Sequence, residues 1–289
     1  MNVSFTNGTT IGDCAVTAIG DYYGKWVKQE AAVRADQDPE ALHQMRVALR
    51  RLRSGLICFS PILSPTMRQQ EPRVGKIGRV LGRLRDLDVL RQELTGNYLP
   101  LLPPGEQARL QEYLDLLVPQ RQKRLTRVHR LLASPFYQKT RGKIAQWLEK
   151  PQLQESADFP VTEMIPTFLL PALKQLLLPS WNLDTPKELH DLRKLFKMTR
   201  YQLECFAPYF SEDLRQSLRH LRTAQDVLGF LHDRMVLTAA ISKRRWEQLP
   251  RLREIVRQHQ SEDWRTWYSL HHNLEWLQVL LQIRSLAPE

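Results

Sequence analysis

Four nitrogen-bearing side chains stand at helical spacing in the first part of the sequence. His43, Arg46, Arg50 and Arg53 are separated by three, four and three residues. On an α-helix these offsets fall on one face, so the side chains would form a row about 15 Å long. Arginine presents a planar fork of donors that matches phosphate oxygens. The row therefore predicts a binding site for an anion, and its length suits a linear polymer.

Few carboxylates accompany this row. Residues 41–85 contain ten lysines and arginines but one acidic residue, Glu71. The whole chain has 42 basic and 31 acidic side chains, so the remainder carries 32 and 30. Surface helices usually mix both signs because opposite charges one turn apart stabilise a helix. The excess of positive charge indicates a polyanionic partner, such as a nucleic acid, a phosphate polymer or an anionic membrane.

The second half of the chain repeats the pattern. A shift of 147 residues places Pro39 on Pro186 and Phe59 on Phe206, and without a gap it places residues 80–90 on 227–237. Agreement at many positions in one register predicts an internal duplication. Two basic rows could then line one groove if the halves pack about a pseudo-two-fold axis. The second row consists of His190, Arg193, Lys197 and Arg200.

The pattern of apolar residues predicts an all-α protein, because no strand-like alternation is present. Expected helices cover residues 11–33, 39–60, 65–94, 106–132 and 135–148. Asp38 and Pro39 are typical of a helix start. The proline-spaced segment 151–186 is interpreted in part as a linker. We expect one domain over residues 1–289, with a first helical half at 8–150 and a second at 155–284.

Two pairs of motifs resemble a known family. HQMRVALRRLRSGLICF with LGRLRDLDVL, and ELHDLRKLFKMTRYQLECF with LGFLHDRMVL, are similar to motifs of the CHAD family, the conserved histidine α-helical domain. The resemblance covers both halves of the chain. It implies two pseudo-symmetric helical bundles around a basic central channel that binds inorganic polyphosphate. It also implies polyphosphate granules as the location and other polyphosphate-metabolising proteins as partners.

The residues of the family motif can be assigned to individual positions of this sequence. Its second-half form has Met198 where a second basic residue is usual, so we expect weaker binding there, with Lys194 compensating from another face. Further helices are expected to supply the other wall of the channel. The matching first-half residues are His43, Arg46, Arg50, Arg51 and Arg53, those of the second half are His190, Arg193, Lys197, Arg200 and Tyr201, and the predicted wall residues are Arg73, Lys76, Arg79, Arg83, Arg215, Arg219 and Arg222.

Another basic block is less regular. It could contribute to binding or simply form a solvated surface, and the sequence leaves both interpretations open. Its members are Arg121, Lys123, Arg124, Arg127 and Arg130.

Metal and cofactor chemistry are not expected. No His or Cys lies three or four residues from His43 or His190, so metal ligands would not converge there. We interpret both histidines as phosphate donors or structural groups. Asp86, repeated as Asp233, is expected to pair with an arginine. Three separated cysteines, Cys14, Cys58 and Cys205, form no metal or disulfide motif and are expected in the core.

Two other functional classes share features with this sequence. An HD-type phosphohydrolase could use His190-Asp191 and His232-Asp233, but the first-half equivalents His43-Gln44 and Arg85-Asp86 do not match, so no enzyme is predicted. Binding of RNA or DNA stays an alternative, although single-strand binders interleave aromatic residues and the basic window has one, Phe59. The sequence contains no secretory signal pattern and no span of about 20 apolar residues, so a cytoplasmic protein is expected.

Overall fold

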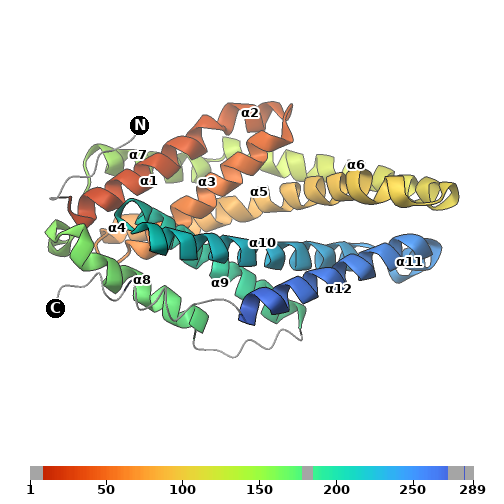
Figure 1. The fold of residues 1–289 in the computed structure, drawn as a ribbon. Helices are drawn as coiled ribbons and strands as arrows, with labels where there is room; N and C mark the ends of the chain where they lie inside the picture. Colours follow the sequence, from red (N-terminus) through yellow and green to blue (C-terminus); the bar gives the residue numbers. More distant parts are fainter. Residues whose placement is uncertain (1–8, 178–184, 273–282, 284–289) are drawn as a thin grey trace.

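The computed structural model describes residues 9–177, 185–272 and 283. Regular structure in these residues is helical apart from two isolated β-bridges, which confirms the all-α class (Figure 1). The helices are α1 (Ile11–Lys28), α2 (Glu30–Ala35), α3 (Pro39–Cys58), α4 (Pro65–Arg68), α5 (Gln70–Glu93), η1 (Leu94–Tyr98), η2 (Leu99–Leu101), α6 (Pro104–Ala133), α7 (Pro135–Glu149), η3 (Glu155–Asp158), α8 (Val161–Leu177), α9 (Pro186–Cys205), η4 (Ala207–Tyr209), α10 (Glu212–Ala240), α11 (Lys243–Gln248) and α12 (Pro250–His272).

Local capping explains where the two central helices begin. Asp38 accepts a hydrogen bond from the backbone N–H of Glu40, and Pro39 occupies the first helical position of α3. Thr185 forms a capping box with Glu188 at the start of α9. Both helices have 20 residues, and their bounds differ by the predicted shift of 147. The bounds agree with the repeat register, while the duplication itself stays a prediction.

The segment interpreted in part as linker contains a full helix. Helix α8 includes Pro166 and Pro171, each of which removes one intrahelical hydrogen bond. Its apolar face is nevertheless buried, with Ile165, Leu169 and Leu173 fully enclosed. Burial of such side chains contributes about 1.5–3 kcal/mol each. Residues 161–177 are therefore not among the linker parts of this segment, because tertiary packing outweighs the local effect of proline.

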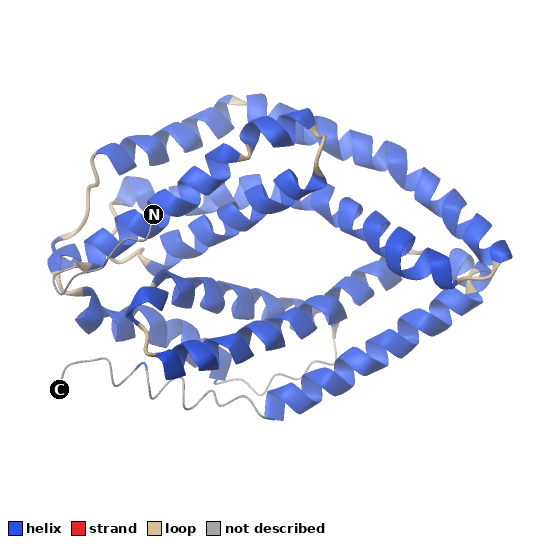
Figure 2. Ribbon diagram, turned by 45° about the horizontal axis from the view of Figure 1, so that its top comes forward, coloured by secondary structure: helices blue, strands red, loops and turns tan. Residues whose placement is uncertain are grey.

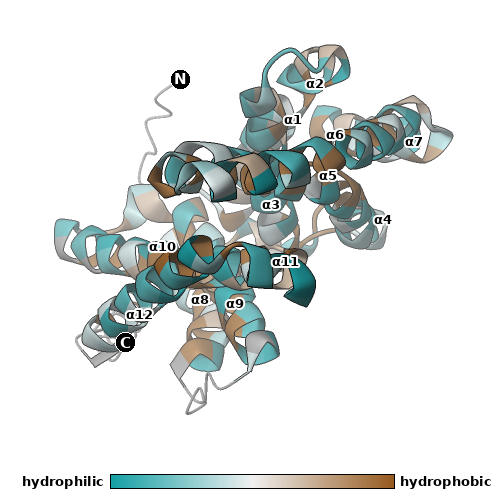
Figure 3. Ribbon diagram, turned by 90° about the vertical axis from the view of Figure 1, so that its right-hand side faces the viewer, coloured by the Kyte–Doolittle hydropathy of each residue, from teal (hydrophilic) through white to brown (hydrophobic). Residues whose placement is uncertain are grey.

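Two hydrophobic cores hold the halves together. The larger core joins α1, α3, α5, α8, α9 and α10, and the rings of Phe59 and Phe206 lie 5.5 Å apart within it. The second core joins the far ends of α5 and α10 to α6 and α12. Figure 2 shows the helices diverging between these ends, and Figure 3 shows first-half helices on one side and second-half helices on the other. The middle of the molecule is thus framed by helices from both halves.

A buried carboxylate stabilises the second core. Glu106, near the start of α6, accepts hydrogen bonds from the backbone N–H groups of Arg251 and Leu252, at 3.0 and 3.1 Å. These N–H groups belong to the first turn of α12, which has no intrahelical acceptors for them. Glu106 therefore caps α12 from the other half of the molecule.

The three cysteines meet where α1, α3 and α9 pack. All are buried and free of disulfides, as expected from the sequence. The Cys14 Sγ lies 3.6 Å from the carbonyl oxygen of Cys205, and the Tyr22 hydroxyl lies 3.8 Å from the Cys205 Sγ. Burial raises the pKa of Cys205 to about 12. These thiols are core groups and stay protonated at neutral pH.

Among the helices in residues 9–177 and 185–272, none is both long enough and apolar enough to cross a membrane.

Candidate anion-binding site

The predicted first row lies on α3, where it contacts α5. His43, Arg46 and Arg50 are half-buried, and Arg53 is exposed. Two glycines of α5 make room for the guanidinium groups. A Cβ atom added at Gly82 would lie 3.1 Å from the Arg46 Nη1, and one added at Gly75 would lie 3.1 Å from the Arg53 Nε. The absence of side chains at these positions lets the arginines lie close against α5.

Equivalent aspartates hold one arginine in each half. The Arg46 Nη1 lies 3.3 Å from Asp86, and the Arg193 Nη2 lies 3.6 Å from Asp233. These pairs confirm the prediction that the repeated aspartate contacts an arginine. Both carboxylates are more than half exposed, so water screens them and the pairs contribute little to stability. Their main effect is to orient the two guanidinium groups.

The two rows meet at Lys197 on α9. Burial, followed by the positive charges of Arg193 and Arg50, lowers the pKa of Lys197 from its ordinary 10.5 to about 7. Asp233 opposes this shift, and Arg46 adds to it. Arg50 also lowers the pKa of Arg193, after burial as the largest cause. Helices α3 and α9 pack against each other, and the Arg50 guanidinium carbon lies 5.9 Å from the ring centroid of Tyr201, one turn after Lys197 on α9. Side chains of α3 and α9 therefore converge here. We call Arg46, Arg50, Arg193 and Lys197 the cationic cluster.

Two members of the cationic cluster lack a neutralising partner. Within the described ranges, no carboxylate lies within 4 Å of Arg50 or Lys197. The Arg50 Nε is buried and donates no hydrogen bond to any described residue. Partly desolvated like charges are unfavourable when no anion compensates them. A bound polyanion would relieve this repulsion, so the cluster can act as an anion-binding site.

Tyr201 and Glu204 join the two rows beneath the cationic cluster. Tyr201 is buried, and the guanidinium carbons of Arg200, Arg51 and Arg50 lie 4.6, 5.8 and 5.9 Å from its ring centroid. Glu204 forms an ion pair with Arg51 of α3 at 3.1 Å and accepts a hydrogen bond from Arg200 of its own helix at 2.8 Å. The Glu204 carboxylate therefore connects α3 to α9 and holds Arg200 beside this connection. The position of Arg51 and Arg200 favours a role in holding the rows together.

The histidines occupy one end of each row. The His190 Nδ1 lies 3.0 Å from the His232 Nε2, and the His232 Nδ1 lies 3.3 Å from Asp233. Burial first, and then His232, lowers the pKa of His190. Burial and then Arg85 lowers the pKa of His43. Arg85 and His232 occupy positions that the 147-residue shift aligns with each other. Neither of them was among the predicted site residues, although this alignment could have identified both.

Among the residues whose placement is described, no group of three or more His, Cys, Asp or Glu side chains could hold a metal ion.

Several predicted cations pair locally instead of joining the cationic cluster. Lys194 contacts Asp191 on its own helix at 2.7 Å, and Arg53 contacts Glu71. Arg215 and Arg219 both contact Glu212, at 3.8 and 3.2 Å. Arg79 and Arg222 are exposed. Exposed ion pairs of this kind contribute about 0–1 kcal/mol to stability, so an anion with more charge can displace them. The role of these residues in binding stays a prediction.

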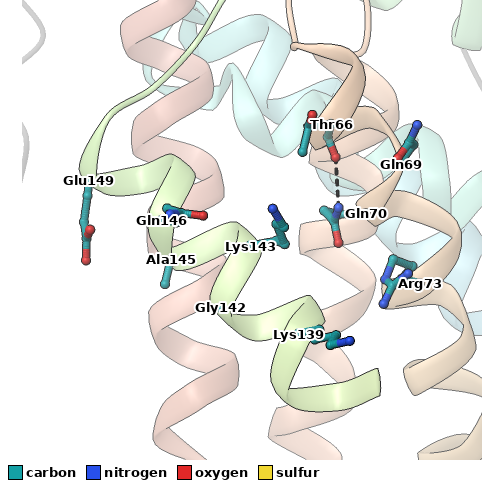
Figure 4. A pocket seen from close by; sticks show the side chains of 10 residues that line it. All are labelled: Thr66, Gln69, Gln70, Arg73, Lys139, Gly142, Lys143, Ala145, Gln146 and Glu149. Atoms are coloured by element: carbon teal, nitrogen blue, oxygen red, sulfur yellow. Dashed lines mark hydrogen bonds between the residues drawn. The ribbon is translucent and has the colours of Figure 1, made fainter. Parts of the chain in front are cut away.

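Arg73 faces α7 and not α3. Its Nε donates to the Thr140 hydroxyl at 3.1 Å, and its guanidinium carbon lies 4.8 Å from the Phe136 ring centroid. Arg73 lines an open pocket of about 850 Å³ between α5 and α7, together with Lys139 and Lys143 (Figure 4). The other predicted wall residues of α5, Lys76 and Arg83, line a groove along α6.

Most of the sequence matches a described family. The family model described as "CHAD domain" matches residues 17–242. Two solved structures share the fold. The CHAD domain from the plant Ricinus communis is 22% identical, with a TM-score of 0.67 over 100% of this chain and 97% of that one. PptA from Streptomyces chartreusis is 17% identical, with a TM-score of 0.71 over 91% of this chain and 100% of that one. No curated protein matches this sequence.

Proposed function

The chain belongs to the CHAD domain family, and from that premise we propose that its cationic cluster binds inorganic polyphosphate without altering it chemically. The resemblance of the paired motifs first suggested this ligand. The observation that carries the proposal is that Arg50 of α3 reaches the surface of α9 beside Lys197, 5.9 Å from the Tyr201 ring, and that no described carboxylate lies within 4 Å of Arg50 or Lys197. Association with polyphosphate granules would follow from this binding.

Polyphosphate suits the cationic cluster better than a single small anion. Each phosphate unit brings a negative charge, so consecutive units can contact arginines of α3 and of α9 in turn. Arginine forks bind two phosphate oxygens at once. Tyr201, the aromatic residue at the cationic cluster, is buried beneath guanidinium groups and offers no face for stacking a base. This arrangement favours a phosphate chain over a single-stranded nucleic acid.

The test removes the two unneutralised charges. Arg50→Gln with Lys197→Gln should weaken polyphosphate binding at least about a hundredfold, since hydrogen bonds to charged groups contribute about 1.5–3 kcal/mol each. Glutamine is preferred to glutamate, because added negative charge would repel Asp86 and Asp233 nearby. The melting temperature should stay constant or rise, since desolvated like charges are removed.

Arg253→Gln with Arg257→Gln is the matched control, because both residues are exposed on α12 and two basic side chains are likewise replaced by glutamine. Titration calorimetry at fixed ionic strength would measure affinity, with RNA as competitor. Binding retained by the cluster variant, or RNA that displaces polyphosphate but is not displaced by it, would contradict the proposal. Phosphate release from the bound polymer would contradict a purely binding role.

A further inference from the structure

A second concentration of positive charge lies in a groove between α5 and α6. The groove has a volume of about 400 Å³, and its apolar lining consists of Val80, Leu131 and Phe136. The fold brings together part of the irregular basic block and part of the predicted channel wall, which the sequence presents as two separate features. We call this feature the outer groove. Its cations are Lys76 and Arg83 from α5, and Arg124, Arg127 and Arg130 from α6.

These cations have no neutralising partners in the described part of the chain. None of the residues lining the outer groove is acidic, and no described carboxylate lies within 4 Å of its five cations. Arg121, one turn before Arg124 on the same helix, differs sharply. It contacts Asp36 and Asp88, each at 2.7 Å. Of the five members of the basic block, Arg121 is therefore structural, and Lys123 does not line the outer groove. The other three arginines remain available for an external anion.

The spacing of the cations suits an extended ligand. Arg124, Arg127 and Arg130 span about 9 Å along α6, and Lys76 to Arg83 span about 10 Å along α5. The Arg124 Nη1 donates to the carbonyl oxygen of Arg83, which fixes one end of the groove. At the other end, the Lys76 Nζ lies 4.8 Å from the Phe136 ring centroid. Positive charge thus lines both sides of the groove along its length.

We propose that the outer groove holds a second stretch of the polyphosphate chain that occupies the cationic cluster. The proposal rests on the function proposed above. Gly82 of α5 contacts Arg46 of the cationic cluster, and the next residue, Arg83, lines the outer groove. The cationic cluster and the outer groove therefore flank the same helix, α5. An α-helix with its side chains is about 10–12 Å across. A long chain can cross α5 and contact both sites, whereas tripolyphosphate can occupy one.

A regular phosphate chain matches the outer groove better than an acidic peptide does. Cations face the groove from both sides, and a phosphate chain carries charge on every unit and in all directions around its axis. A peptide helix would present carboxylates on one face at intervals of a turn. The apolar floor lowers the local dielectric and so strengthens each contact with phosphate.

The experiment compares three variants and three ligands at fixed pH and ionic strength. Arg127→Ala with Arg130→Ala removes two exposed charges of the outer groove, and alanine preserves the helix. Arg253→Ala with Arg257→Ala is the charge-matched control, and Arg50→Gln with Lys197→Gln tests the cationic cluster. The ligands are tripolyphosphate, long-chain polyphosphate and a polyglutamate peptide, and calorimetry measures each affinity.

We expect the outer-groove variant to lose at least about tenfold in affinity for long-chain polyphosphate and to bind tripolyphosphate like the wild type. Equal effects on both phosphate ligands, or effects no larger than those of the control, would overturn the inference. Tighter, groove-dependent binding of polyglutamate would overturn the phosphate assignment. Failure of the underlying function looks different, because the cationic-cluster variant would then bind both phosphate ligands normally.

Discussion

Lys197 makes the proposed binding sensitive to pH in a predictable direction. Its pKa of about 7 reflects burial first, then Arg193 and Arg50, with Arg46 adding to the shift and Asp233 opposing it. A bound polyanion favours the protonated ammonium, so binding above pH 7 must take up a proton. Affinity therefore falls as pH rises through 7, until the pH reaches the pKa of Lys197 in the complex.

The size of the effect follows from the pKa of the free protein. If the complex keeps Lys197 protonated throughout, affinity should fall about fifty-fold between pH 7 and pH 9. At pH 8, about 0.9 proton should be taken up for each protein bound. The pKa values of His43 and His190 are lowered below 6.5, so both rings are mostly neutral in the free protein over this range.

Calorimetry in two buffers of different ionisation enthalpy measures the proton uptake directly. Lys197→Arg keeps a positive charge that does not titrate, so this variant should bind with a flat pH profile and no uptake. Lys194→Arg is the matched control, because Lys194 is exposed on the same helix and contacts Asp191. A Lys197→Arg variant with the wild-type pH slope would refute the reasoning.

The same pKa shift predicts the stability of the ligand-free protein. The folded-state pKa of Lys197 lies below its ordinary value, so the unfolded chain binds more protons between about pH 7 and 10.5. The contribution of this group to the free energy of unfolding should therefore rise with pH across that window. Denaturant titrations at several pH values would give the free energy of unfolding of the wild type and of Lys197→Arg, and the difference between the two would give the contribution of Lys197.

Gly82→Ala, with Gly78→Ala as its control, tests the packing around Arg46, and Glu106→Ala tests the second core. Gly82→Ala should displace the Arg46 guanidinium and weaken polyphosphate binding. In the control Gly78→Ala, on the same helix, the added Cβ meets no atom within 4 Å, so this variant should only stabilise α5, by roughly 1 kcal/mol. Equal polyphosphate affinities of the two variants would contradict the placement of Arg46. Glu106→Ala should lower the free energy of unfolding by about 2 kcal/mol, because two N–H groups of α12 lose their acceptor; thermal unfolding would measure this, and an unchanged melting temperature would contradict the cap.

The sequence by itself determined the helical class and predicted a site for an anion. Helix starts such as Asp38-Pro39 depend on neighbouring residues, so they can be predicted without knowing the fold. The row on α3 follows from helical periodicity in the same way. The aspartate partner of Arg46 was also accessible, because repetition in the second half marked Asp86 as significant.

Only the tertiary structure decided which charges are compensated and where they lie. Arg50 and Lys197 are 147 residues apart in sequence, and neither could be recognised beforehand as lacking a carboxylate partner in the described structure. Arg73 turned toward α7, and Arg124 joined a groove with Arg83, because helix packing sets these directions. Distances between remote side chains, and the burial that shifts the pKa of Lys197, arise only when the helices pack, so no local pattern in the sequence encodes them.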